Sequence, residues 1–185
     1  AGDRPYTGLS LTHGNAQFVT LAPSLKMGLR AVISRKFSKS RLWDIVRKHG
    51  CTTFSLLGGM VTAIHAEPRK SNDADNPVRL VISAGMPKAL WEDFADRFAV
   101  GIFEFYGAME GGMSIKRPGE GPVGSCGKPA PGLIVQIVDE DGNQIQATSH
   151  VGARPFNKEE IAKIKRVNVC ISCHQDMPTE FWDKV

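Results

Sequence analysis

A short segment, residues 103–113, carries side chains whose types and spacing suit ligand binding. Its sequence is Phe-Glu-Phe-Tyr-Gly-Ala-Met-Glu-Gly-Gly-Met, so an aromatic ring at Tyr106 and a carboxylate at Glu110 stand among glycines. A flat ring can stack on a base, and a carboxylate can bind Mg²⁺. We expect this segment to form a ligand site. The alternatives are an ordinary surface aromatic and a solvated charge.

The elements that must position this segment follow an alternating pattern. The expected strands are residues 6–12, 29–34, 52–57, 78–83 and 100–103, and the expected helices are residues 39–49, 58–66 and 88–98. Strands that alternate with helices pair in parallel and form an α/β sheet. Ligands bind such sheets beyond the carboxyl ends of the strands. We therefore predict an α/β fold in which Tyr106 lies in a loop after the strand at residues 100–103.

The helix at residues 39–49 has clear start and stop signals. Ser38 is a good N-cap, and Gly50 can adopt the left-handed conformation that ends a helix. Its expected buried stripe consists of Leu42, Trp43, Ile45 and Val46. Residues 15–29 show only a mixed helical spacing, which Pro23 interrupts.

The character of the chain changes after residue 119. Residues 124–132 predict a turn-rich connector, and residues 133–138 predict a strand. An Asp-Gly pair within residues 139–143 predicts a hairpin turn. A small β segment is therefore expected to follow the parallel sheet.

Four motifs between residues 6 and 146 resemble, in order, those of adenylate-forming (AMP-binding) acyl-CoA synthetases, with crotonobetaine/carnitine-CoA ligase-like enzymes as the nearest group. Leu-Thr-His at residues 11–13 is similar to the Pro-Leu-x-His element beside the acyl pocket. Ser-Ala-Gly-Met-Pro at residues 83–87 resembles the loop that borders adenine. Residues 105–110 resemble Tyr-Gly-x-Thr-Glu, and residues 124–141 resemble Gly-x-x-Gly-x-Pro-x-Pro-Gly followed by Val-Asp-x-x-Gly.

The resemblance implies an incomplete N-terminal subdomain of an adenylate-forming enzyme over residues 1–146. It implies part of an AMP-forming ligase that takes a small-molecule carboxylic acid, ATP with Mg²⁺, and CoA in the cytoplasm. It assigns nucleotide binding to Gly85, Met86, Pro87, Glu104, Phe105, Tyr106 and Gly107. By the same resemblance Glu110 is a catalytic Mg²⁺ ligand and His13 borders the acyl pocket, although His13 could instead be a structural core histidine.

Departures from the family pattern limit the activity expected of this chain. Met109 replaces the family's Thr, and a thioether cannot donate the hydrogen bond that a hydroxyl gives to the AMP phosphate. The chain also lacks the family's Ser/Thr/Gly-rich phosphate loop, its ribose-binding Asp with the following Arg, and its C-terminal catalytic Lys. Charge on a transferring phosphate must be neutralised by positioned groups. We expect no acyl-adenylate formation by this chain alone.

The tail, residues 147–185, carries a different motif. A helix is predicted at residues 158–167, and it leads to Cys170-Ile-Ser-Cys173-His174. Two thiols at this spacing can attach to haem vinyl groups while the adjacent imidazole ligates iron, as in c-type haem attachment. The tail resembles a haem-binding end of a multihaem c-type cytochrome, which implies a redox partner and a periplasmic location. A Zn site that includes His150, a redox dithiol and the absence of any cofactor are the alternatives.

Composition limits the remaining function classes. The 185 residues carry a net charge of +4 with 42% hydrophobic and 23% charged residues, which is ordinary for a globular protein. A basic group gathers at Arg30, Arg35, Lys36, Lys39 and Arg41. It lacks interleaved aromatics, so we predict a solvated face and no nucleic-acid site. No apolar run approaches the roughly 20 residues of a membrane span.

Two further interpretations concern the chain as a whole. The chain opens with Ala-Gly-Asp in place of Met, so we expect a processed chain or a fragment. The ligase and haem motifs belong to different compartments, so a joined sequence with a seam between residues 143 and 154 is expected. A non-catalytic remnant that only binds a partner is the third hypothesis beside the ligase and the haem protein.

Overall fold

The computed structural model of the chain describes residues 2–108 and 112–133. By its internal contacts the chain divides into two units, Ala1–Leu133 and Ile134–Val185, and all described residues belong to the first. The predicted strand at residues 133–138, the hairpin turn and the whole tail therefore fall almost entirely outside the described residues. No helix of the described part is long and apolar enough to span a membrane.

The described residues form one mixed sheet of seven strands in the order β2-β1-β3-β4-β5-β6-β7. The strands are β1 (Pro5–Thr7), β2 (Val32–Ile33), β3 (Thr53–Leu57), β4 (Leu80–Ala84), β5 (Gly101–Gly107), β6 (Met113–Lys116) and β7 (Lys128–Pro129). Strands β1 to β5 pair in parallel, whereas β6 and β7 add antiparallel pairs. The predicted α/β fold, with parallel strands joined by helices, is confirmed. Strands β6 and β7 were not predicted, and the β segment predicted from residue 133 onward lies almost entirely outside the described residues.

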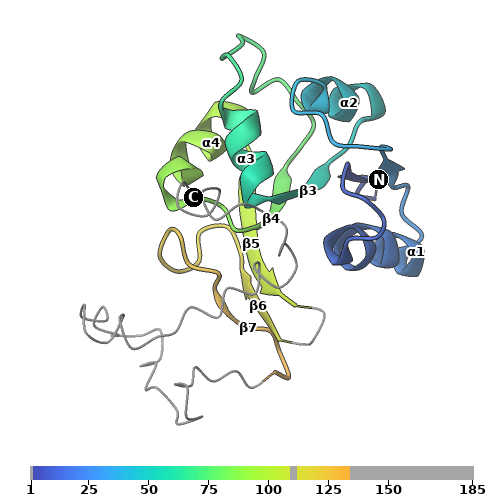
Figure 1. Ribbon diagram of the computed structural model, residues 1–185, viewed down its shortest axis with the longest axis vertical. Helices are drawn as coiled ribbons and strands as arrows, with labels where there is room; N and C mark the ends of the chain where they lie inside the picture. The colour runs from blue at the N-terminus through green and yellow to red at the C-terminus, as the bar shows by residue number, and fades with distance from the viewer. Residues whose placement is uncertain (1, 109–111, 134–185) are drawn as a thin grey trace, which may run out of the picture. The chain divides into compact units, whose positions relative to one another are not determined.

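The helical segments connect the parallel strands. They are the π-helix η1 (Asn15–Leu21), α1 (Ala22–Met27), α2 (Leu42–His49), α3 (Gly58–His65), the short 3₁₀ turn η2 (Lys88–Leu90) and α4 (Trp91–Phe98). Figure 1 shows α3 and α4 side by side, with α1 apart from them. Pro23 stands at the start of α1, where the wide π-helical turn changes to an α-helical one.

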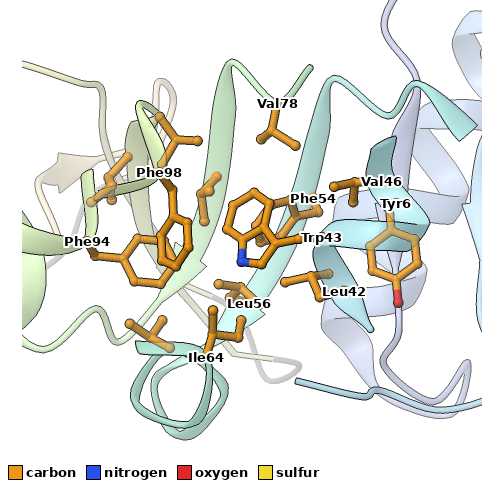
Figure 2. Packing of buried hydrophobic residues seen from close by; sticks show 14 of the residues in the cluster. Tyr6, Leu42, Trp43, Val46, Phe54, Leu56, Ile64, Val78, Phe94 and Phe98 are labelled. Carbon is orange, nitrogen blue, oxygen red and sulfur yellow. The ribbon is translucent and has the colours of Figure 1, made fainter. Parts of the chain in front are cut away.

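An aromatic cluster joins helices α2 and α4 to strand β3. The Trp43 ring stacks on Phe98 with a centroid distance of 4.3 Å and meets Phe54 edge-on at 5.5 Å. The ring centroids of Phe94 and Phe98 are 4.8 Å apart, and Figure 2 shows these rings packed over the sheet. Burying a side chain of this size contributes about 1.5–3 kcal/mol. The cluster therefore fixes one helical layer on one face of the sheet.

Several predicted element boundaries were wrong. The strand predicted at residues 6–12 ends at Thr7, and the strand predicted at residues 29–34 is reduced to Val32–Ile33. Helix α2 begins at Leu42, not at Lys39. The Ser38 carbonyl oxygen accepts hydrogen bonds from the Arg41 and Leu42 N–H groups in a turn before the helix, and the Ser38 side chain makes no cap. Strand β5 continues through Gly107, because residues 104–107 pair with β6. The predicted stop at Gly50 is confirmed, with φ of 60°.

A buried ion pair holds the long connection between α3 and β4. This connection is polar in sequence, yet Asp73 within it is buried, and the Asp73 Oδ2 atom accepts a hydrogen bond from the Arg97 Nε–H at 2.8 Å. Arg97 also donates to the carbonyl oxygens of His65 at 2.7 Å, Glu67 at 2.9 Å and Pro68 at 3.1 Å. One guanidinium from α4 therefore satisfies four acceptors of this connection.

We expect Asp73→Asn to lower the free energy of unfolding at neutral pH by about 3 kcal/mol, because it leaves the buried Arg97 charge unpaired. Burial alone would raise the pKa of Asp73, but the Lys70 N–H and the Arg97 guanidinium outweigh it and lower that pKa. The carboxylate's contribution is therefore present above the unfolded pKa of about 3.9 and is lost as pH falls through the folded pKa.

Chemical unfolding of Asp73→Asn and wild type across this acidic range measures the effect. The difference should shrink as the pH approaches about 2. The exposed Asp75→Asn is the matched control and should stay within about 0.5 kcal/mol of wild type. Equal losses for the two variants would contradict a special role for the Asp73–Arg97 pair.

Candidate functional site

The carboxyl ends of β4 and β5 lie side by side and bring two of the predicted motifs together. Ser83 in β4 is in register with Glu104 in β5. The turn at residues 85–87 follows β4, while residues 105–107 complete β5. The seven residues assigned to nucleotide binding by sequence therefore gather at one edge of the sheet.

The Glu104 carboxylate connects the two strand ends directly. It is only 5% exposed, and its Oε1 accepts the Gly85 N–H at 2.5 Å. Both carboxylate oxygens lie 3.2 Å from the Met86 amide nitrogen. Glu104 thus points into the protein and orients the backbone of the turn, so it serves as a positioning residue.

Glu104 keeps its place at an electrostatic cost. Burial raises the pKa of its carboxyl group, while the Gly85 and Met86 N–H groups, the nearby Ser83 hydroxyl and the Lys116 ammonium lower it, and the net direction is upward. Lys116 is opposite Glu104 across the β5–β6 pair and is itself buried, with its ammonium 4.1 Å from the centre of the Trp91 ring. Burial disfavours the charged form of this carboxylate. That the protein nevertheless buries it here indicates that the turn must keep one defined backbone conformation.

Two glycines allow the turn to approach its neighbour. Gly85 has φ of +89°, a conformation that other residues rarely adopt. A Cβ atom on Gly58, at the start of α3, would stand 2.5 Å from the Gly85 carbonyl oxygen. The ends of β3 and β4 therefore meet backbone to backbone, which leaves no room for side chains between them.

Tyr106 presents its ring at this edge. It lies within β5 opposite Ser114 and is 40% exposed, whereas the neighbouring Phe105 is buried. The sequence placed Tyr106 in a loop; the structure places it on a paired strand, which holds the ring more rigidly. Met109 and Glu110 lie outside the described residues, so the predicted Mg²⁺ ligand has no described position.

His13 follows β1, whose carboxyl end faces the same edge of the parallel sheet. It is half-buried, and its Nδ1 accepts the Asn15 N–H at 3.1 Å at the start of η1. Strand β3 separates β1 from β4, so His13 stands on a different strand end from Gly85 and Tyr106. Cys170, Cys173 and His174 lie outside the described residues. Within the described part, no group of three or more His, Cys, Asp or Glu could hold a metal ion.

We predict that Glu104→Ala lowers the free energy of unfolding by about 2–3 kcal/mol, because the buried N–H groups of Gly85 and Met86 lose their acceptor. Glu104→Gln should change it by less than about 1 kcal/mol, since removal of a costly buried charge offsets one mismatched amide. Hydrogen exchange at the Gly85 and Met86 amides should accelerate in both variants. The exposed Glu92→Gln is the control, and unchanged exchange in Glu104→Ala would contradict the positioning role.

The chain matches the family described as AMP-binding enzyme over residues 1–153. It is 38% identical over 128 residues to human long-chain fatty acid transport protein 1, covering 69% of this chain and 20% of that protein. It is 35% identical over 148 residues to a medium/long-chain-fatty-acid–CoA ligase of Mycobacterium tuberculosis, covering 80% and 29%. Against the steroid-22-oyl-CoA synthetase of Rhodococcus jostii the identity is 36% over 161 residues, covering 85% and 29%.

Solved structures share the fold at lower identity. A benzoate CoA ligase from Burkholderia xenovorans matches with a TM-score of 0.71 and 20% identity, covering 86% of this chain and 36% of that one. The o-succinylbenzoate CoA synthetase of Bacillus subtilis, solved in complex with ATP and magnesium ion, matches with a TM-score of 0.64 and 22% identity, covering 84% and 31%. The chain spans 20% to 29% of the length of the three named relatives. From the match over residues 1–153, this chain belongs to the AMP-binding enzyme family.

Proposed function

We propose that this chain is part of an ATP-dependent, AMP-forming acyl-CoA ligase and contributes the corner of the active site that holds adenine. The observation that carries the proposal is the joined end of β4 and β5. There the buried Glu104 carboxylate fixes the Gly85–Met86 turn next to the exposed Tyr106 ring. A flat exposed ring beside a fixed backbone turn suits a planar base, which needs one stacking face and a few polar edge contacts.

The proposed roles follow from these positions. The Tyr106 ring stacks on adenine, and the backbone of residues 85–87 and Gly107 borders its edge. Glu104 and Phe105 hold the two strand ends from inside, where both are buried. Glu110 is the proposed Mg²⁺ ligand, with ATP phosphate oxygens and water as the usual further ligands of this ion. His13 borders the acyl group.

The substrate class is an apolar carboxylic acid. The named relatives include a medium/long-chain-fatty-acid–CoA ligase and a steroid-22-oyl-CoA synthetase, and they support this choice. The crotonobetaine or carnitine class suggested by the sequence motifs is the competing polar substrate. In the reaction the carboxylate would attack the α-phosphate of ATP, releasing pyrophosphate, and CoA would then displace AMP from the acyl-adenylate. These steps place the ligase in the cytoplasm, beside ATP and CoA.

Binding is the activity to measure on this chain, because Met109 cannot donate a hydrogen bond to the phosphate. AMP should raise the melting temperature of the wild-type chain at millimolar concentration. Tyr106→Ala should weaken AMP binding roughly 5- to 150-fold, since stacking of an aromatic on a base contributes about 1–3 kcal/mol. Tyr106→Phe should bind like wild type because it keeps the ring.

Ile33→Ala is the control for loss of an exposed side chain. Ile33 is 42% exposed, compared with 40% for Tyr106, and lies in β2 at the opposite end of the sheet. Isothermal titration with AMP compares the three variants. Equal affinity for Tyr106→Ala and Ile33→Ala, or no binding by the folded wild type, would exclude the proposed adenine site.

The Cys-x-x-Cys-His spacing at residues 170–174 supports a second candidate, covalent haem c attachment on the tail. We predict that chain produced in a host with c-type haem maturation shows a Soret band and an intact mass above its 20.1 kDa by one haem. Cys170 and Cys173 would form the thioethers, and His174 would ligate iron. Such a chain would be periplasmic and would exchange electrons with a redox partner. Colourless protein at the apo mass, matching a Cys170→Ser/Cys173→Ser control, would remove this candidate.

A further inference from the structure

Strand β6 carries a buried cation to which the proposed adenine site assigns no role. The Lys116 side chain is 3% exposed, and its ammonium nitrogen lies 4.1 Å from the centre of the Trp91 ring at the start of α4. A lysine is rarely buried unless its charge is compensated. An aromatic ring attracts a cation in this position but carries no net charge of its own. Full compensation of Lys116 therefore requires a carboxylate.

The carboxylate that faces Lys116 is that of Glu104. The two residues are register partners across the antiparallel pair of β5 and β6, so their side chains leave the sheet on the same face. Both side chains are buried. Burial raises the pKa of the Glu104 carboxyl group, and the attraction of the Lys116 ammonium acts against this effect. Each of the two charges therefore lowers the cost of burying the other.

The groups that face the Glu104 carboxylate come from three parts of the chain. The Ser83 hydroxyl belongs to β4, the Gly85 and Met86 N–H groups belong to the turn after β4, and the Lys116 ammonium belongs to β6. Among these four groups, only the ammonium carries a charge. The ionisation of Glu104 is therefore coupled to one cation that lies outside the parallel part of the sheet.

We propose that Lys116 is a further positioning residue, which keeps Glu104 ionised and thereby holds the backbone of the Gly85–Met86 turn in place. The turn uses both carboxylate oxygens, because Oε1 accepts the Gly85 N–H and both oxygens lie 3.2 Å from the Met86 amide nitrogen. Protonation would turn one of these oxygens into a donor, which opposes an N–H group. Loss of the Lys116 charge should therefore loosen the turn at a higher pH than in the wild type.

A pH titration of the isotope-labelled full chain, followed by nuclear magnetic resonance, tests this role. The Gly85 and Met86 amide resonances report the ionisation of the carboxylate that they bind. Lys116→Met removes the charge but keeps an unbranched side chain, and it should raise the midpoint of the titration by at least about half a pH unit. Lys116→Arg keeps the charge and should titrate close to the wild type. Lys128→Met removes an exposed charge from the adjoining strand β7 and should not move the midpoint.

Two further variants make this test independent of the fold of any one protein. Lys116→Gln removes the same charge with a polar side chain and should move the midpoint in the same direction as Lys116→Met. Glu104→Gln lacks the titrating group, so its Gly85 and Met86 amides should show no such transition. A midpoint that is unchanged in the folded Lys116→Met and Lys116→Gln variants would overturn the proposal.

The consequence for AMP binding rests on the proposed function and is measured separately, by isothermal titration over the same pH range. Below both midpoints, Lys116→Met should bind AMP at least about threefold more weakly than the wild type, since half a pH unit corresponds to that factor. Well above the midpoints the two affinities should agree. An equal loss of affinity at every pH would overturn the proposal in favour of a purely structural role. A displaced midpoint without AMP binding by the folded wild type would support the role of Lys116 at the turn and exclude the adenine site.

Discussion

The candidate site depends on the buried carboxylate of Glu104 and on the two hydrogen bonds that it accepts from the backbone N–H groups of Gly85 and Met86. Through them the end of β5 determines the conformation of the turn after β4. This conformation requires a positive φ at Gly85. It also requires a glycine at position 58, because a side chain there would collide with the Gly85 carbonyl oxygen. Burial opposes the charge on Glu104, and Lys116, opposite it on β6, is the nearby cation that offsets part of the cost. The pairing of β6 with β5 therefore belongs to the site as much as the parallel strands do.

Behind this edge, the fold supplies rigidity in two ways. The rings of Trp43, Phe54 and Phe98 lock α2 and α4 onto β3. The Arg97 guanidinium binds the connection that leads into β4 through a carboxylate and three carbonyl oxygens. A strand whose two ends are both fixed can present a turn of defined geometry. Precise placement of this kind is what a small polar ligand requires.

The elements with strong periodic patterns could be predicted from sequence, and those determined by distant partners could not. Strand β3, helix α3 and the Gly50 stop follow from apolar spacing and glycine position. The extent of β5 could not, because it depends on pairing with β6. A glutamate between two phenylalanines at residues 103–105 also fits a half-exposed strand, so only the fold reveals that Glu104 is buried and accepts hydrogen bonds from the Gly85 and Met86 amides. The Asp73–Arg97 pair looks like ordinary loop and helix charge in sequence, and the π-helical turns of η1 have no clear pattern.

The central claim is that adenine stacks on Tyr106 beside the Gly85–Met86 turn. Nuclear magnetic resonance of the isotope-labelled chain with AMP tests it most directly. Stacking of adenine on Tyr106 predicts intermolecular nuclear Overhauser effects between the adenine protons and the Tyr106 ring, together with shifts of the Gly85 and Met86 amide resonances. Saturable AMP binding that leaves these three residues unchanged would contradict it.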